Sequence, residues 1–233
     1  LDEIRQTVVA TSQVPLYVND PVAVTAEGTP VRIVRNAETN LGDLCADAYR
    51  ALSNADIAFV NGGGIRKQIE AGDITLDDIY SVHPFGNTMC VIRVTGQQVL
   101  DALEWGARAV LSENGGFLQV SGLTYEIHTG VASSAEKDEN GMFTRVSGEY
   151  RVKNVMVGGQ PLELDKTYTL ASHNYMLLGH GDGYTMFDGC EVLGEDMMVD
   201  NQVLITYITT TLGGVVGEQY ANPYGDGRIV AVE

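Results

Sequence analysis

The sequence predicts an α+β fold in which strands and helices form mixed α/β sheet layers. Two observations lead to this class. Apolar residues make up 44% of the 233 residues, which is ample for the core of one large domain or two small ones. Segments with helical spacing and segments with strand patterns alternate irregularly along the chain, and some neighbouring strands follow one another as in hairpins.

The first 30 residues are expected to form a linker helix and an extended lead-in. Leu1 to Ser12 has a weakly helical, polar pattern without the features of a signal peptide, and we expect the chain to be part of a longer protein. The stretch that follows contains "VPLYVNDPVAV", in which Pro15 and Pro21 break regular structure. The folded domain is therefore expected over residues 31–233.

Helical spacing predicts four further helices. In "ETNLGDLCADAYRALSN", either Thr39 or Asn40 can cap the start of the helix. In "ITLDDIYSVHP", Thr75 is a candidate N-cap with Asp78 three residues on, and the helix must stop before Pro84. The other two helices are expected in "TGQQVLDALEWGARAVL" and "NQVLITYITTTL".

Short apolar or alternating runs predict the strands. They lie in "ADIAFVNGG", "TMCVIRVTG", "LQVSGLTYEIH", "YRVKNVMVGG" and "KTYTLASHNYML".

Charge and cysteine content exclude several classes of protein. Thirty-one acidic residues against 14 basic ones give a net charge of -17, which argues against nucleic acid as a partner. No apolar run reaches the roughly 18 residues that a membrane span needs. The three cysteines form no CxxC pair, and we expect Cys45 and Cys90 to be buried free thiols.

Three glycines follow a predicted strand in "FVNGGGIRK". The motif is neither a Walker phosphate loop, since the Gly-Lys-Ser/Thr ending is absent, nor GxGxxG. Glycines at a strand end let backbone N–H groups and a ligand approach each other. Asn61 can hydrogen-bond a sugar or a base edge, and Arg66 suits a phosphate or carboxylate. A tight bend beside a solvated arginine is the alternative interpretation.

Two more loops carry residues suited to a flat ligand. "HPFGN" places Phe85 on a turn, and "SHNYMLLGHGDGYTMF" leaves a buried strand through Tyr175 toward Asp182. Two aromatic side chains on such loops can sandwich a flat ring, and an aspartate can hold a sugar diol or a ring nitrogen. Phe85 as core filler and Asp182 as a turn former are the alternatives.

Taken in order, these motifs resemble a known family. The series "ETNLGDLCADAYR", "ADIAFVNGGGIRKQIEAGDIT", "VHPFGN", "FLQVSGL" and "HNYMLLGHGDGY" is similar to the C-terminal domain of the 5'-nucleotidase/UDP-sugar hydrolase family. The resemblance runs from about Arg35 to the closing "GDGRIVAV".

The resemblance implies a substrate-binding domain for a nucleoside or nucleotide, with no catalytic residue of its own. Phe85 and Tyr175 would clamp the base, and Asp182 would bind the ribose. Asn61, Gly63 and Asn87 would line the base and sugar pocket, whereas Arg35 and Arg66 would contact phosphates. Those are the roles that the family assigns to the matching positions.

One position departs from the family pattern. The segment from the aromatic residue to Asp182 is one residue longer than usual, and an alignment without a gap puts Met176 at the clamp position. We favour Tyr175 with a one-residue insertion, because this keeps the family's Asn-aromatic pair. With Met176, a thioether would replace one aromatic wall.

The resemblance also implies that hydrolysis is divided between domains. In this family a separate N-terminal metallophosphatase domain of the same polypeptide holds two divalent metal ions, and its DxH and GNHE motifs do not occur in this sequence. We therefore expect no cofactor in this domain, a hydrolase only as part of a larger 5'-nucleotidase, and an extracytoplasmic location. The rival expectation is a binding or interaction module that does not catalyse.

Overall fold

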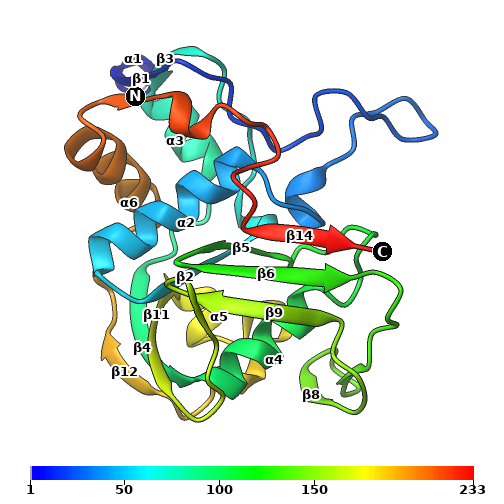
Figure 1. Ribbon diagram of the computed structural model, residues 1–233. Helices are drawn as coiled ribbons and strands as arrows, with labels where there is room; N and C mark the ends of the chain where they lie inside the picture. Colours follow the sequence, from blue (N-terminus) through cyan, green and yellow to red (C-terminus); the bar gives the residue numbers. More distant parts are fainter. Residues whose placement is uncertain (1) are drawn as a thin grey trace.

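The computed structural model describes residues 2–233 (Figure 1). They form β-sheets with α-helices packed against them, which confirms the predicted class. No helix in this range combines the length and apolar character needed to cross a bilayer.

The helices are α1 (Asp2–Arg5), α2 (Asn40–Ser53), α3 (Leu76–Val82), α4 (Gly96–Gly106), α5 (Asn174–Leu177) and α6 (Asp200–Thr206). The strands are β1 (Val8–Ser12), β2 (Ile57–Asn61), β3 (Gly72–Thr75), β4 (Met89–Thr95), β5 (Leu118–Ser121), β6 (Leu123–His128), β7 (Ala135–Lys137), β8 (Phe143–Val146), β9 (Val152–Val157), β10 (Gln160–Pro161), β11 (Thr167–His173), β12 (Glu191–Gly194), β13 (Val215–Val216) and β14 (Ile229–Val232).

A five-stranded sheet in the order β12-β4-β11-β2-β5 positions the loops of interest. β11 runs parallel to β2, with Leu170 opposite Ile57, and antiparallel to β4, with His173 opposite Met89. The ends of β2 and β11 and the start of β4 therefore lie at one edge of the sheet. Three connecting segments meet there: residues 62–66, 83–88 and 174–184.

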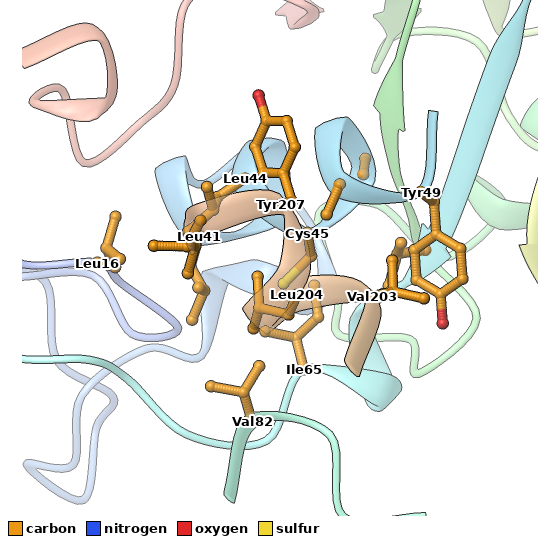
Figure 2. Packing of buried hydrophobic residues seen from close by; sticks show 14 of the residues in the cluster. Leu16, Leu41, Leu44, Cys45, Tyr49, Ile65, Val82, Val203, Leu204 and Tyr207 are labelled. Atoms are coloured by element: carbon orange, nitrogen blue, oxygen red, sulfur yellow. The ribbon is translucent and has the colours of Figure 1, made fainter. Parts of the chain in front are cut away.

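Two hydrophobic cores lie on opposite faces of this sheet. Along β2, Ala58 and Val60 face the first core and Ile57 and Phe59 face the second, as the two-residue repeat of a strand requires. α2 and α6 pack into the first core and α4 into the second (Figure 1). Figure 2 shows side chains of α2 and α6 meeting in the first core: Leu41, Leu44, Cys45, Val203 and Leu204.

Two of the predicted helix starts are confirmed at the level of the capping residue. Thr39, not Asn40, caps α2, because its hydroxyl accepts the N–H of Gly42 at 2.9 Å. Thr75 and Asp78 form the expected capping box of α3.

The helix predicted through "ARAVL" ends earlier, at Gly106. Beyond it, the guanidinium of buried Arg151 donates to the carbonyls of Ala107 and Val110 at 3.0 and 2.8 Å. A distant arginine thus satisfies carbonyl groups that a longer helix would have used, and it was not visible in the local pattern.

The N-terminal prediction is wrong in its second half. Only Asp2–Arg5 is helical, and Leu1 lies outside the described residues. Val8–Ser12 forms β1, which pairs antiparallel with β3 and parallel with β13. Ala10 and Ser12 point inward in strand alternation, so partners far along the chain override the weak helical pattern.

The prediction for two of the three cysteines is confirmed. Cys45 and Cys90 are fully buried, and both are free thiols. Burial raises the pKa of the Cys45 thiol and raises the pKa of Cys90 to about 12. Both thiols are therefore protonated at neutral pH, and neither is a nucleophile.

A group of charges joins α2 to the C-terminal strand β14. Arg228 donates to both carboxylate oxygens of Asp47, at 2.7 and 3.0 Å. Glu38, which is 3% exposed, accepts the backbone N–H of Ile229 at 3.0 Å. These contacts fix the end of the chain against the start of α2.

Asp43 is the least compensated member of this group. It is 2% exposed, its Oδ1 lies 3.5 Å from the Nε of Arg228, and it contacts Glu38. Burial, with the hydrogen bond to Glu38, raises the pKa of Asp43 to about 10. Asp43 is therefore a protonated carboxyl group at neutral pH.

Asp43→Asn should stabilise the fold at neutral and alkaline pH. The pKa of Asp43 is raised in the folded state above its ordinary value of 3.8. The protonated Asp43 side chain therefore contributes its full stabilisation to the fold below pH 3.8, and this contribution declines as the pH rises toward 10. An amide keeps a donor toward Glu38 without needing a proton, so the gain should grow with pH. We expect on the order of 1–3 kcal/mol at pH 7, measured by urea unfolding.

Asp47→Asn is the matched control, one helical turn further along α2. It removes a charge that Arg228 uses, so it should destabilise the fold. A loss of stability in Asp43→Asn at alkaline pH would show that Asp43 is ionised in the folded protein.

Candidate functional site

The three segments at the sheet edge enclose a cavity of about 480 Å³. This is within the size range of small-molecule sites. All eight residues predicted for the site line it: Arg35, Asn61, Gly63, Arg66, Phe85, Asn87, Tyr175 and Asp182. The structure thus brings together residues that are as much as 147 positions apart, from Arg35 to Asp182.

A chain of hydrogen bonds crosses the floor of the cavity. The side-chain amide of Asn61, at the end of β2, donates to Oδ2 of Asp182 at 2.7 Å. Oδ1 of Asn61 lies 2.8 Å from Nε2 of His173, at the end of β11. The parallel pairing of β2 and β11 brings Asn61 and His173 together, and Asp182 is tied to this edge through Asn61.

Asp182 is also fixed through its backbone. It has a φ of 57°, in the left-handed region that aspartate tolerates better than most residues. Its carbonyl accepts the indole N–H of Trp105 on α4 at 2.8 Å. The carboxylate therefore has a defined direction before any ligand arrives.

The glycine triplet lies at the cavity, where Gly63 and Gly64 line it, but two of its N–H groups are not available to a ligand. The N–H groups of Gly62 and Gly63 donate to the carbonyls of Phe117 and Gly115 at 2.7 and 2.8 Å, so these two donors serve the fold. A Cβ on Gly62 would lie 2.3 Å from the carbonyl oxygen of Val34. The triplet lets three segments pack closely, and Asn61 and Arg66 on either side of it reach the cavity.

Two aromatic side chains line the cavity and are unusually exposed. Phe85 is 59% exposed and Tyr175 is 46% exposed. The guanidinium of Arg66 lies 5.7 Å from the centre of the Phe85 ring, whereas Tyr175 lies beside the ring of His173. Both aromatic residues thus leave surface free for a flat ligand.

Met176, the alternative clamp residue, does not line the cavity. Its side chain is fully buried in the second core. Of the two candidates, only Tyr175 is presented to a ligand in this structure.

Arg35 forms no salt bridge within the part of the chain that the structure describes. Its Nε is buried, and no hydrogen-bond partner for it exists within residues 2–233. Burial lowers the pKa of Arg35, and the neighbouring cations Arg32 and Arg66 lower it further. An arginine nevertheless stays charged at neutral pH, so an anionic ligand would relieve this arrangement.

Asn87 lies at the opposite end of the "HPFGN" loop from His83. Its backbone N–H and carbonyl both bond to Asp200, at 3.1 and 2.8 Å, which anchors the loop to α6. The anchored loop carries Phe85 into the cavity lining.

The donors of the cavity do not suit a pair of divalent ions. Asp182 is the only carboxylate among the described residues that line it, and both ring nitrogens of His173 are engaged. A carboxylate cluster of Glu38, Asp43 and Asp226 lies outside this cavity, and the guanidinium of Arg228 already meets it, 3.0 Å from Asp226.

Sequence reasoning missed part of the lining. Gly64, Gly115 and His173 also border the cavity. His173 is one of the four histidines of the sequence, and their spacing does not indicate a metal site. The feature of the sequence that could have identified His173 is its position at the end of a buried strand, directly before "NYM".

Comparison with known sequences gives a family. The family model described as the 5'-nucleotidase C-terminal domain matches residues 8–189. The trifunctional nucleotide phosphoesterase protein YfkN of Bacillus subtilis is 36% identical over 203 residues, which are 85% of this chain and 13% of that protein. A 5'-nucleotidase of Vibrio cholerae is 33% identical over 176 residues, which are 76% of this chain and 28% of that protein. The chain thus spans a minor part of these relatives.

Comparison with solved structures also finds a 5'-nucleotidase. The 5'-nucleotidase precursor of Thermus thermophilus superposes with a TM-score of 0.78 at 30% identity, over 100% of this chain and 41% of that one. An NAD nucleotidase of Haemophilus influenzae has a TM-score of 0.69 at 20% identity, over 100% of this chain and 39% of that one. The second likeness concerns the fold alone.

Proposed function

Because this chain belongs to the family of 5'-nucleotidase C-terminal domains, we propose that it binds the nucleoside and phosphate parts of a nucleotide for hydrolysis. The hydrolytic chemistry belongs to an N-terminal metallophosphatase domain of the same polypeptide, which would hold two divalent metal ions. This chain binds no metal of its own and positions the substrate.

One observation carries the proposal: the eight predicted residues line a single cavity. Phe85 and Tyr175 offer exposed aromatic faces for a base, and Asp182 offers a fixed carboxylate for sugar hydroxyls. Arg35 and Arg66 supply positive charge for a phosphate in a chain whose net charge is -17. The alternative interpretations, a tight bend beside a solvated arginine and Phe85 as core filler, would not explain this combination of features.

The relatives support a nucleotide phosphoester as the substrate class and nucleotide catabolism as the role. The Bacillus subtilis protein is named a nucleotide phosphoesterase, and the Vibrio cholerae protein is named a 5'-nucleotidase. The Thermus thermophilus protein is named a precursor, which fits an exported protein. We extend an extracytoplasmic location to this chain on that basis.

The aromatic walls can be tested by substitution. Phe85→Ala and Tyr175→Ala should each weaken adenosine binding by about 1–3 kcal/mol, since each removes one stacking face. Isothermal titration calorimetry with adenosine, AMP and uridine nucleotides measures this loss.

Tyr224→Ala is the matched control, because Tyr224 is 47% exposed and its hydroxyl bonds Asp20, which does not line the cavity. Unchanged affinity in both cavity variants would exclude the aromatic clamp. No binding of any nucleoside by the folded chain would favour the module that does not catalyse.

The phosphate contact has a separate signature. Arg35→Gln should lower the affinity for AMP roughly tenfold and leave the affinity for adenosine unchanged, because only AMP carries the anion. Arg93→Gln, an exposed arginine paired with Glu191, should change neither affinity. Equal losses for adenosine and AMP in Arg35→Gln would mean that Arg35 supports the fold instead of the phosphate.

Hydrolysis gives the third test. The purified chain should show no release of phosphate from AMP when divalent metal ions are added, because the cavity offers no ligand set for two ions. Phosphatase activity that depends on added metal, and that survives further purification, would contradict the division of roles.

A further inference from the structure

We infer that His173 is a positioning residue that fixes the amide of Asn61 in one orientation and thereby makes the site prefer sugars with two neighbouring hydroxyl groups. This inference rests on the proposed function, since it concerns the sugar of a bound nucleoside. His173 itself lies behind Asn61, at the end of β11, and acts through it.

The orientation of Asn61 follows from its neighbours. The carboxylate of Asp182, 2.7 Å away, can only accept a hydrogen bond, so the NH2 group of Asn61 must face it. The oxygen of Asn61 must then face Nε2 of His173 at 2.8 Å. His173 is therefore protonated at Nε2 and donates to Asn61.

The other side of the imidazole requires the same tautomer. The backbone N–H of Met176 points at Nδ1 of His173 at 3.4 Å, and an N–H group can only donate. Nδ1 must therefore be an unprotonated acceptor, and His173 is the N-cap of α5. Two independent neighbours, Asp182 through Asn61 and Met176 directly, agree on one neutral form.

Burial keeps that form over the physiological range. His173 is 4% exposed, and burial, with the nearby His83, lowers its pKa to about 3. Rings of Tyr49 and Tyr175 flank it at 6.5 and 6.0 Å between centroids. The donor to Asn61 is therefore present whenever the protein is folded near neutral pH.

The glycine segment holds the other side of the amide. A Cβ on Gly64 would lie 2.7 Å from Oδ1 of Asn61, so this position of the oxygen needs glycine there. Nδ1 of His83 donates to the carbonyl of Gly64 at 2.8 Å, since a carbonyl can only accept. Asn61 is thus enclosed on both sides by fixed groups.

The fixed amide determines what the cavity offers to a sugar. One N–H of Asn61 is used by Asp182, and the second has no partner within residues 2–233; because Asn61 lines the cavity, we take this N–H as the donor for a ligand. Oδ1 of Asp182 has only a long contact, 3.5 Å, to the hydroxyl of Tyr175, and is an acceptor for a ligand. A donor beside an acceptor matches two neighbouring hydroxyl groups. A rotated amide would turn its oxygen toward Asp182, so that two acceptors would face each other.

Two variants separate positioning from helix capping. In His173→Gln the amide lies as many bonds from Cα as Nε2, so it can still donate to Asn61. In His173→Asn the amide lies as many bonds away as Nδ1, so it can cap α5 but does not reach Asn61. We measure the ratio of the affinities for adenosine and 2'-deoxyadenosine by calorimetry.

Positioning predicts that His173→Gln keeps this ratio and that His173→Asn lowers it roughly tenfold. A capping role predicts the reverse order, and that result would overturn the inference, as would equal ratios in all variants. His180→Gln, an exposed histidine that pairs with Asp188, is the control and should leave the ratio unchanged.

A second readout needs no ligand. Nitrogen NMR of the 15N-histidine-labelled chain should show His173 protonated at Nε2 alone between about pH 5 and 8, where a free histidine titrates. Protonation at Nδ1, or titration in that range, would overturn the assignment. If the tautomer is as assigned and the wild-type chain binds no nucleoside, the proposed function fails while the positioning of Asn61 stands.

Discussion

The site depends on the parallel pairing of β2 with β11. This pairing brings Asn61 and His173, 112 residues apart, to the same edge of the central sheet, within one hydrogen bond of each other. The antiparallel strand β4 starts at that edge and brings the loop of Phe85 to it. Both faces of β2 are buried, so a one-residue slip of register would misplace apolar side chains in two cores as well as Asn61. The packing of the two cores therefore fixes the register of β2 and, with it, the position of Asn61 in the cavity.

Electrostatics distinguish the cavity from the rest of the chain. The surface is acidic, with a net charge of -17, yet Arg35 and Arg66 line the cavity without an ion pair among the described residues. At the start of α2, outside the cavity, carboxyl groups of Glu38, Asp43 and Asp47 contact Arg228 or the backbone next to it and hold the C-terminal strand. The two arginines of the cavity are available to a ligand, whereas the charged groups around Arg228 are paired with one another inside the fold.

Local signals in the sequence predicted much of this structure. Threonine caps, apolar periodicity and the strand before the glycines require only neighbours along the chain, and they were confirmed. The errors came from distant partners. Pairing with β3 and β13 makes Val8–Ser12 a strand, Arg151 accompanies the early end of α4, and Phe117 and Gly115 occupy the N–H groups of the glycines. The eight predicted site residues came from ordered motifs and the family resemblance, and they line one cavity, whereas His173 was not predicted because its contact with Asn61 depends on a parallel neighbour.

The central claim is that the cavity at the end of β2 and β11 holds a nucleotide. A crystal structure of the chain with bound AMP tests it most directly. We predict the base between Phe85 and Tyr175, the sugar hydroxyls at Asp182 and the phosphate toward Arg35. A bound nucleotide outside this cavity, or one whose base avoids both aromatic rings, would contradict the account.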